Sequence, residues 1–407
     1  MVWYDSYYRK RIDPANFSVP LRLMRRATLR IRYRKESDML APVDAYVTNI
    51  ETDGVQGTHP APPVYLDDQE AALLAAIQQR GRRCIPAFAL YDGLGSTLHH
   101  ALTLIPENHQ FRAENAILQA HVAHIVAWAQ SRQCLPLSQS ISRAPILQCH
   151  IADLRCGSGQ KTRVIVEAIA TKMSTTLFAV DISEEALRQC TVTMANLHAV
   201  EVIPFETTYL PALRMISEIR PDDAPLLSLF LNSAISEFDA DAIVPFLAEV
   251  REQMRPGDAL LIGTEGIHSH TETTHQYNDA LGIEAAFGKN ALNFVNRALD
   301  GDFDVTSFDY TVSAKSLAGP LPYNLAIVEP ALVARSTQYV SLRKAGATLV
   351  IEEGERLNMA HSVKFGAGSI AAMGREAGFG VLAEWRDPET GFTDTFFYVP
   401  PPGQAPD

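Results

Sequence analysis

The chain has 407 residues and is 47% hydrophobic, enough for one large domain or two modest ones with a substantial core. Its formal net charge of −12 argues against nucleic acid as the main partner. Every apolar run falls short of the ~18 residues that a membrane-spanning helix requires, so no membrane span is predicted.

The cysteines indicate a reducing compartment. Their number is odd, their positions are scattered and no CxxC pair occurs, so we expect neither a disulfide framework nor a zinc knuckle. The first residues also lack the pattern of a secretory signal peptide. We therefore predict a cytoplasmic protein. The five residues are Cys84, Cys134, Cys149, Cys156 and Cys190.

Residues 1–66 are predicted to form a basic N-terminal extension. Residues 1–35 hold ten of the 35 Lys and Arg but only two acids, Asp5 and Asp13. Such a segment could contact an acidic surface, an anionic membrane or a targeting receptor, or it could be a tail that packs on the acidic remainder of the chain.

Helices are predicted next. Asp67 to Glu70 place acids in the first turn of one helix, a favourable position for negative charge. A glycine-rich turn at residues 91–96 precedes a second helix, which Ser96 is expected to cap and Pro106 to end. Arg112 to Trp128 has apolar residues at helical spacing and predicts a third helix.

Residues 147–181 organise the rest of the chain. An apolar run ends at Asp153-Leu154, a turn with Gly157 and Gly159 follows, and a second apolar run ends at Asp181 after an amphipathic stretch. This order predicts strand, glycine loop, helix and strand, the first unit of a nucleotide-binding sheet. Glycine allows a ligand to approach the backbone, and Asp181 can accept hydrogen bonds from ribose hydroxyls.

Several interpretations of this loop remain open. A dinucleotide fold requires a third Gly that is missing after Gly159, and a P-loop requires Gly directly before Lys161 where Gln160 stands. The acid-x-Gly-x-Gly-x-Gly loop of a class I methyltransferase fits with one departure, because Arg155 replaces the first Gly. The loop could also join two strands without binding any ligand.

Strands and helices continue to alternate up to Thr264, which predicts a parallel sheet with right-handed crossovers. A ligand of such a sheet lies beyond the carboxyl ends of the strands. Gly157, Asp181, Glu206, Asn232 and Thr264 fall there. The alternation then breaks and resumes near the C-terminus, so the intervening residues are predicted to be an insertion. The strands expected are Leu147–Leu154, Thr176–Ile182, Glu201–Phe205, Pro225–Leu231 and Ala259–Gly263.

Seven segments together resemble the histidine N-alpha-methyltransferases of ergothioneine biosynthesis. These belong to a wider S-adenosylmethionine-dependent family that includes fungal tryptophan and dimethylallyltryptophan N-methyltransferases. The resemblance covers roughly residues 70–400 and is most specific at residues 277–304. The segments are YDGLGSTL (91–98), PENHQFRAENAIL (106–118), DLRCGSGQKTR (153–163), AVDISEEAL (179–187), MRPGDALLIGTE (254–265), QYNDALGIEAAFGKNALNFVNRALDGDFD (276–304) and HSVKFGAGSI (361–370).

The resemblance implies a class I methyltransferase Rossmann-like α/β sheet with a second, smaller α+β domain built from N-terminal helices and the insertion. Residues 67–110 and 268–360 are then the substrate-binding domain. Residues 111–267 and 361–400 are the S-adenosylmethionine-binding domain. The implied partner is a small amino acid or amine, with no nucleic acid, and we expect a monomer or a weak homo-oligomer.

Cofactor residues follow by position. Gly157 and Gly159 match the family's cofactor loop, Lys161 a cofactor-contacting lysine, and Asp181 the ribose acid. Asp153 and Arg155 belong to the same loop motif. The acid that contacts adenine after the third strand has no clear counterpart, and Glu206, one position away, is the nearest candidate.

Substrate residues agree only in part. Tyr91 matches a substrate-contacting tyrosine, Tyr277 a tyrosine that helps to hold the substrate carboxylate, and Ser362 the serine of an E-x-S-x-K motif. The other positions depart from the family. Asn108 replaces a tyrosine of the site, Glu237 an asparagine that contacts the substrate's amino and carboxylate groups, and Ala360 the glutamate that contacts imidazole.

These departures suggest a changed substrate. An imidazole N–H buried without an acceptor costs about 1–3 kcal/mol, so Ala360 disfavours histidine. A larger apolar ring such as indole gains room and burial there. Glu237 or the Tyr91 hydroxyl could accept the proton that the attacking amine must lose.

Three interpretations therefore remain for the function. The first is N-methylation of a small, aromatic, tryptophan-like amino acid or amine, and the second is histidine N-alpha-methylation. The third is a non-catalytic homologue that binds a small molecule or a partner protein, because Arg155 could be strained by a positive φ or could intrude on the cofactor.

Overall fold

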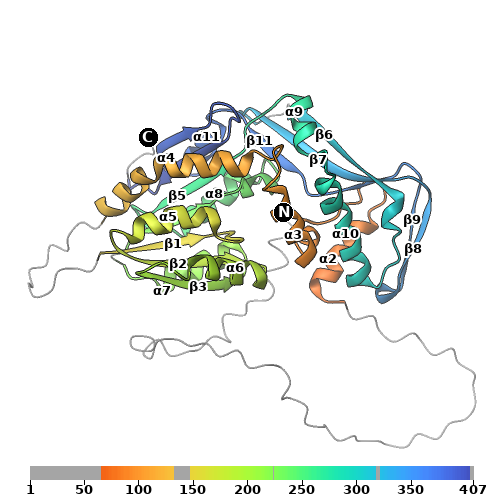
Figure 1. Ribbon diagram of the computed structural model, residues 1–407, viewed down its shortest axis with the longest axis horizontal. Coiled ribbons are helices and arrows are strands. Elements are labelled where there is room, and N and C mark those ends of the chain that lie inside the picture. Colours follow the sequence, from red (N-terminus) through yellow and green to blue (C-terminus); the bar gives the residue numbers. More distant parts are fainter. Residues whose placement is uncertain (1–65, 133–146, 223, 318–320, 404–407) are drawn as a thin grey trace, which may run out of the picture.

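A computed structural model describes residues 66–132, 147–222, 224–317 and 321–403. The predicted basic extension, up to residue 65, lies outside the described residues. The described chain forms two lobes that lie side by side in Figure 1, with the large sheet in one and α2, α3, α10, β8 and β9 in the other.

The larger lobe contains a seven-stranded sheet in the order β12-β13-β5-β4-β1-β2-β3. β1 to β5 are parallel, whereas β13 runs antiparallel to β5 and to β12. The five strands expected from the sequence are therefore confirmed as one Rossmann-like parallel sheet. Their bounds are β1 Gln148–Asp153, β2 Ser174–Asp181, β3 Val200–Glu206, β4 Leu226–Phe230 and β5 Ala259–Thr264, and the last pair is β12 Gly380–Arg386 and β13 Thr393–Tyr398.

Two hydrophobic cores cover the two faces of this sheet. One face packs against α4 (Gln110–Ser131), α5 (Gln160–Ala170) and α6 (Glu184–Met194). The other packs against α7 (Tyr209–Ile219), α8 (Ile243–Glu252) and α11 (Ser369–Glu376). Because helices cover both faces, the central strands are buried on both sides, and every residue of β4 is buried.

The smaller lobe has its own hydrophobic core. Leu73, Ile77, Leu292 and Leu332 are among its fully buried residues. This separate core supports the predicted domain boundaries, which stay a proposal. Its helices are α2 Asp68–Gln78, η3 Ala87–Leu90, α3 Gly93–Leu102 and α10 Ile283–Leu299. Its strands are β6 Phe308–Ser316, β7 Leu325–Ala334, β8 Gln338–Leu342, β9 Ala347–Ile351 and β10 Arg356–Asn358. Short helices η5 (Val305–Ser307) and η6 (Arg343–Ala345) lie between these strands.

β11 (Ser362–Phe365) joins the two lobes. It pairs antiparallel with β7, as β10 and β6 do in the smaller lobe's sheet. Its side chains Val363 and Phe365 nevertheless belong to the core under the large sheet. The boundary proposed between residues 360 and 361 therefore falls at the start of a strand that both lobes share.

One predicted helix start is wrong. α3 begins at Gly93, and its cap is Asp92, which accepts the Gly95 N–H at 2.7 Å, rather than Ser96. A Cβ on Gly95 would lie 1.8 Å from the Leu90 carbonyl oxygen, so only glycine permits this tight start. Asp92 also accepts a hydrogen bond from Asn290 at 2.7 Å, which ties α3 to α10.

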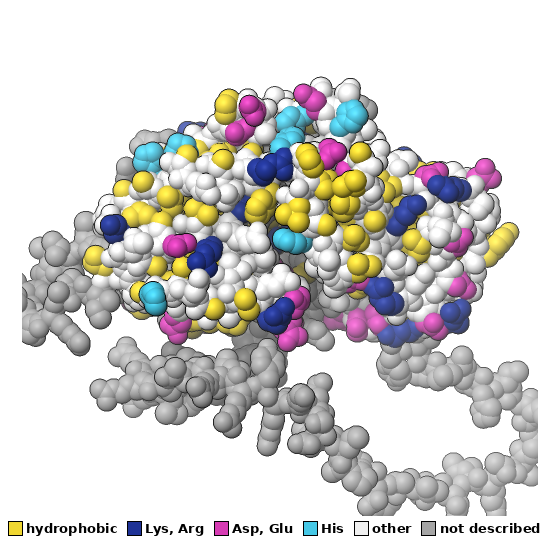
Figure 2. Space-filling model, in the orientation of Figure 1, with side chains coloured by type: hydrophobic (Ala, Val, Ile, Leu, Met, Phe, Trp, Pro, Cys, Tyr) yellow, Lys and Arg dark blue, Asp and Glu magenta, His cyan; other side chains and the backbone are white. Residues whose placement is uncertain are grey.

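Acidic and basic side chains are interspersed over the face of the molecule shown in Figure 2. This face carries no extended run of one sign among the described residues. In the ranges that the structure describes, each helix is too short or too polar to cross a bilayer.

Candidate active site between the two lobes

Two cavities adjoin at the carboxyl ends of the large sheet's parallel strands. The glycine-loop cavity, about 220 Å³, is lined by the turn after β1, by Asp181 and by residues of α3 and α6. The interlobe cavity, about 150 Å³, lies between η4 (Ala234–Glu237), α10 and β11. Tyr91, His99, Asn232 and Glu237 line both cavities.

The glycine loop is shaped by two left-handed residues. Gly157 has φ 49° and Gly159 has φ 73°, a region that favours glycine. A Cβ on Gly159 would lie 2.8 Å from Cys190 Sγ, whereas none of the described atoms lies within 4 Å of one on Gly157. Gly159 is the N-cap of α5, so the first N–H groups of that helix point toward the loop.

Asp181 holds the loop against the end of β2. Its Oδ2 accepts the Gly157 N–H at 3.1 Å, and its Oδ1 accepts the Ser183 N–H at 3.0 Å. A carboxylate has about four acceptor positions, so capacity remains for two hydroxyl donors from a ligand. Asp181 lines the glycine-loop cavity, as the sequence led us to expect for a ribose contact.

Arg155 lines the same cavity without backbone strain. Its φ is not positive, so the left-handed conformation that would have strained it is absent. Its guanidinium turns toward Glu237, with Nη1 2.5 Å from Oε1, and lies 4.8 Å from the centre of the Tyr91 ring. Burial opposes the charge of this guanidinium, but Glu237, Tyr91 and Tyr209 together outweigh it and raise the pKa of Arg155.

Tyr91 stands between the lobes. Its hydroxyl donates to Glu237 Oε1 at 3.3 Å, and its ring meets Phe287 of α10 edge to face at 5.6 Å. Burial and the charge of Glu237 raise the pKa of Tyr91, so the phenol stays protonated at neutral pH. Tyr91 can therefore relay a proton through hydrogen bonds but is not a strong base.

Two predicted cofactor residues are engaged within the protein. Asp153 is buried and accepts a hydrogen bond from Thr162; burial raises its pKa to about 7. The Lys161 ammonium pairs with Glu114, which is fully buried, and lies 4.6 Å from the centre of the Phe111 ring. Lys161 still lines the cavity, whereas Asp153 stands behind the loop.

Glu206 ends β3 directly opposite Asp181 in the strand register. Its side chain is exposed and is not among the residues that line the glycine-loop cavity. Thr207 and Tyr209, which follow it, do line that cavity. Glu206 therefore stands next to residues of the cavity without lining it, and its contact with adenine stays a prediction.

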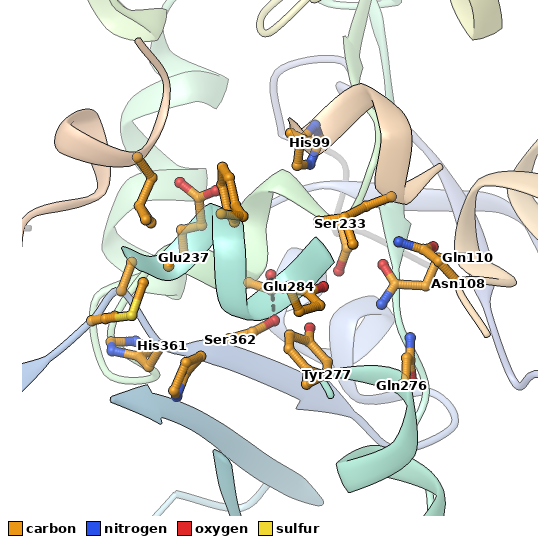
Figure 3. A pocket seen from close by; sticks show the side chains of 18 of the residues that line it. His99, Asn108, Gln110, Ser233, Glu237, Gln276, Tyr277, Glu284, His361 and Ser362 are labelled. Carbon is orange, nitrogen blue, oxygen red and sulfur yellow. Dashed lines mark hydrogen bonds between the residues drawn. The ribbon is translucent and has the colours of Figure 1, made fainter. Parts of the chain in front are cut away.

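A buried lysine organises the far wall of the interlobe cavity. Lys364 pairs with Glu265 and donates to the Tyr277 hydroxyl at 2.5 Å and to Ser362 Oγ at 2.8 Å. Ser362 in turn donates to Ser236 Oγ at 3.0 Å. The two residues expected to hold the substrate, Tyr277 and Ser362, are thus brought together, as Figure 3 shows. Burial lowers the pKa of Lys364, and Glu265 opposes this change.

The three positions that depart from the family resemblance, Asn108, Glu237 and Ala360, also line the interlobe cavity. Ala360 lies between Met359 and His361 on a wall that includes Pro330, while Asn108 stands on the segment before α4. The structure therefore gathers every residue predicted for the substrate around one space.

Three further residues of the site escaped the sequence interpretation: His99, Tyr310 and Glu284. His99 lies on α3 and lines both cavities, where the enclosing protein and then the charge of Arg155 lower the pKa of its imidazole to about 4. Glu284 stands in the first turn of α10, where an acid is favourable for the helix itself, so its pattern gave no signal of a site.

The glycine-loop cavity fits S-adenosylmethionine. The loop has no side chain at Gly157 or Gly159, so the backbone is open to a ligand, and Asp181 has acceptor capacity for two ribose hydroxyls. The Arg155 side chain borders this cavity rather than filling it. Gly157, Gly159 and Asp181 are therefore the residues that would hold the cofactor.

Comparison with known proteins agrees with this site. A family model for the histidine-specific, SAM-dependent methyltransferases matches residues 69–399. The histidine N-alpha-methyltransferase of Mycolicibacterium smegmatis is 27% identical over 327 residues, 80% of this chain and 92% of that protein. The N-methyltransferase fsqC of Aspergillus fumigatus is 22% identical over 321 residues, 76% of this chain and 78% of that protein.

The chain is also similar to solved structures at low identity. The 1,6-didemethyltoxoflavin-N1-methyltransferase of Burkholderia thailandensis, solved with S-adenosylhomocysteine, is 13% identical with a TM-score of 0.36, over 77% of this chain and 89% of that one. The family match spans most of the chain, including both lobes. This chain therefore belongs to the family of histidine-specific, S-adenosylmethionine-dependent methyltransferases.

Proposed function

We propose that this enzyme methylates the amino group of a small aromatic amino acid or amine, tryptophan-like rather than histidine. The observation that carries the proposal is the wall of the interlobe cavity at Ala360. Met359, Pro330 and Phe287 line the same cavity, so an apolar ring gains burial at about 25 cal/mol per Å².

Each lobe contributes part of the binding arrangement. S-adenosylmethionine, when bound, supplies an activated methyl group on its sulfonium. Gly157, Gly159 and Asp181 hold it at the sheet edge, while Tyr277 helps to hold the carboxylate of an amino acid and Ser362 contacts the substrate beside it. Because Tyr91, Asn232 and Glu237 line both cavities, they surround the place where the amine meets the cofactor. Positioning of the two reactants is the main contribution of the protein.

Glu237 is the proposed proton acceptor. The contacts that described residues make with its carboxylate, from Arg155 and Tyr91, both go to Oε1. Oε2 is therefore left to accept a hydrogen bond, and then the proton, from the substrate ammonium. The Arg155 guanidinium and the Tyr91 hydroxyl both contact Oε1 and so fix the orientation of the carboxylate.

Calorimetry tests the proposal. Tryptophan and histidine are titrated into the full chain saturated with S-adenosylhomocysteine, which cannot donate a methyl group. We expect tryptophan to bind at least tenfold more tightly, because the larger indole ring buries more apolar surface against the wall at Ala360 than imidazole does. Tighter binding of histidine refutes the ring preference and favours histidine N-alpha-methylation instead.

A cytoplasmic location and a monomeric or weakly oligomeric state are part of the same proposal. The scattered cysteines support the first, and four of them, Cys84, Cys149, Cys156 and Cys190, are free thiols in the structure. Light scattering of the full chain over a range of concentrations tests the second.

A further inference from the structure

Glu284 of α10 is an acid that the helix does not need. The N–H groups at the start of α10 already donate to Asp279: those of Leu281 and Ile283 to Oδ1 at 3.0 Å, and that of Glu284 to Oδ2 at 2.7 Å. An acid in a first turn usually serves these donors. Here Asp279 serves them, so the Glu284 side chain is available for another role.

That side chain lines the interlobe cavity, as Figure 3 shows. Among the described residues, none forms a hydrogen bond or an ion pair with its carboxyl group. Lys364, whose charge acts on Glu284, is already paired with Glu265. A half-buried carboxyl group without a partner is unfavourable for the folded protein unless a ligand supplies one.

The charges around Glu284 agree with this interpretation. Burial, followed by the negative charges of Asp279 and Glu265, raises the pKa of Glu284 to about 8, and only Lys364 opposes the rise. The surroundings thus resist its negative charge when the cavity holds no ligand. A ligand that donates a hydrogen bond to the carboxylate would reverse this balance.

Glu284 also lies at the end of the cavity where the substrate ring is expected. Gly288 is one turn further along α10, on the same face, and also lines the cavity. A Cβ on Gly288 would lie 3.0 Å from the Tyr310 ring and 3.1 Å from Met359 Cε, so these two residues pack directly against the helix there. Met359 precedes Ala360, which places Glu284 and Ala360 on neighbouring walls.

We infer that Glu284 is a specificity-determining residue whose carboxylate accepts a hydrogen bond from an N–H or O–H group on the substrate's aromatic ring. This inference rests on the proposed function and narrows it. The ring lies against Phe287, Pro330 and Met359, and Glu284 selects rings that carry a hydrogen-bond donor. Tryptophan is then preferred over phenylalanine, and over rings of the same shape without a donor.

Calorimetry separates the donor from the shape of the ring. Tryptophan is compared with 3-(3-benzothienyl)alanine, in which sulfur replaces the indole N–H, in the full chain saturated with S-adenosylhomocysteine. At pH 9, where Glu284 is ionised, we expect the wild type to prefer tryptophan by about tenfold, since a hydrogen bond to a charged group is worth at least that factor. Glu284→Ala should abolish the preference, and Glu284→Gln, which keeps an acceptor oxygen, should retain part of it.

A control variant distinguishes selection from a general effect of charge. Glu218 of α7 is exposed and lines neither cavity, so Glu218→Gln should leave both affinities unchanged. If the wild type and Glu284→Ala show the same ratio of affinities, Glu284 does not select ligands by the donor on their ring, and the inference is overturned. An equal loss of both ligands in Glu284→Ala, at unchanged ratio, likewise overturns it.

Failure of the proposed function gives a different result. If histidine binds more tightly than tryptophan, the ring preference is wrong, but histidine can then be compared with 3-(2-thienyl)alanine in the same variants. That five-membered ring lacks an N–H group. A preference for histidine that Glu284→Ala abolishes supports the role of Glu284, and a preference that survives the substitution overturns it.

Discussion

The Arg155 guanidinium pairs with the Glu237 carboxylate at the junction of the two cavities, with Nη1 2.5 Å from Oε1. Glu237 lines both spaces, whereas Arg155 lines the glycine-loop cavity. The Tyr91 hydroxyl donates to the same oxygen. An arginine that looked like an obstacle to the cofactor is therefore tied to the proposed proton acceptor.

A double-mutant cycle on Arg155→Ala and Glu237→Gln measures this relationship. Both side chains are a quarter exposed, so solvent screens the pair and we expect a coupling of about 1 kcal/mol in the free energy of unfolding. Each single variant should lower kcat/KM at least tenfold, and the double variant should lose less than the product. Urea unfolding and steady-state kinetics supply the two readouts.

Arg335→Ala is the control for this cycle, because Arg335 forms an exposed ion pair with Asp309 away from both cavities. It should leave kcat/KM unchanged. Losses in kcat/KM that simply multiply in the double variant would mean that Arg155 and Glu237 act independently.

The pH dependence of ligand selection follows from Glu284. Its pKa is raised to about 8, by burial first and then by Asp279, so the carboxyl group is mostly protonated at pH 7 and ionised at pH 9. The ionised form accepts a hydrogen bond more strongly. The ratio of tryptophan to benzothienylalanine affinity should therefore rise between pH 7 and pH 9.

Two phenols near Glu284 do not titrate in this window, and Lys364, whose pKa burial lowers, is also present in the Glu284→Gln control. The pKa values of Tyr277 and Tyr310 are raised well above their ordinary range, chiefly by burial, so both phenols stay protonated through this window. The amino groups of tryptophan and benzothienylalanine titrate alike, so their ionisation does not change the ratio of the two affinities. A ratio that is flat in the wild type, or that rises equally in Glu284→Gln, would count against the assignment.

The two loop glycines should respond differently to alanine. Gly157→Ala adds the cost of a left-handed residue, about 1–2 kcal/mol, in open space. Gly159→Ala adds the same cost and a contact of 2.8 Å with Cys190 Sγ, which forces α5 and α6 apart. We expect Gly159→Ala to lower the melting temperature more and to weaken S-adenosylhomocysteine binding more.

Thermal unfolding with and without S-adenosylhomocysteine measures both effects. Gly157→Ala is the matched control, since the two positions share the loop and the sign of φ. Equal destabilisation of the two variants would show that the contact with Cys190 relaxes without cost.

The sequence was sufficient for the large sheet and its loop. The run from Gln148 to Asp181 carries strong local signals: buried apolar strands, two glycines and a closing acid. Such signals depend on residues that are close in the sequence, so they can be recognised without knowledge of the tertiary structure. The cap of α3 was missed because Ser96 and Asp92 both suit an N-cap, and only the contact between Gly95 and Leu90 decides between them.

The polar partners within the site could not be predicted in the same way. Lys161 meets Glu114 47 residues earlier in the chain, and Lys364 meets Glu265 99 residues earlier. Pairing over such separations depends on how distant parts of the chain pack together. The periodicity of the sequence carries no information about that packing. Glu284 was missed for a different reason. An acid in the first turn of a helix is expected to stabilise the helix, and only the structure shows that Asp279 already accepts the N–H groups there.

The buried pair of Lys364 and Glu265 gives a last prediction, which separates stability from binding. Both side chains are at most 3% exposed. Lys364→Met leaves the Glu265 carboxylate buried without its cation and should lower the free energy of unfolding by about 3–5 kcal/mol. Combining it with Glu265→Leu removes both charges and should recover most of that loss, because a buried ion pair is often replaced by apolar residues at little cost.

Binding should not recover in the double variant. Lys364 also donates to Tyr277 and Ser362, the residues proposed to hold the substrate, and methionine cannot replace those hydrogen bonds. Urea unfolding together with calorimetry of tryptophan in the presence of S-adenosylhomocysteine tests both parts. A stable double variant with wild-type affinity would show that the lysine serves folding alone, and that Tyr277 and Ser362 keep their positions without it.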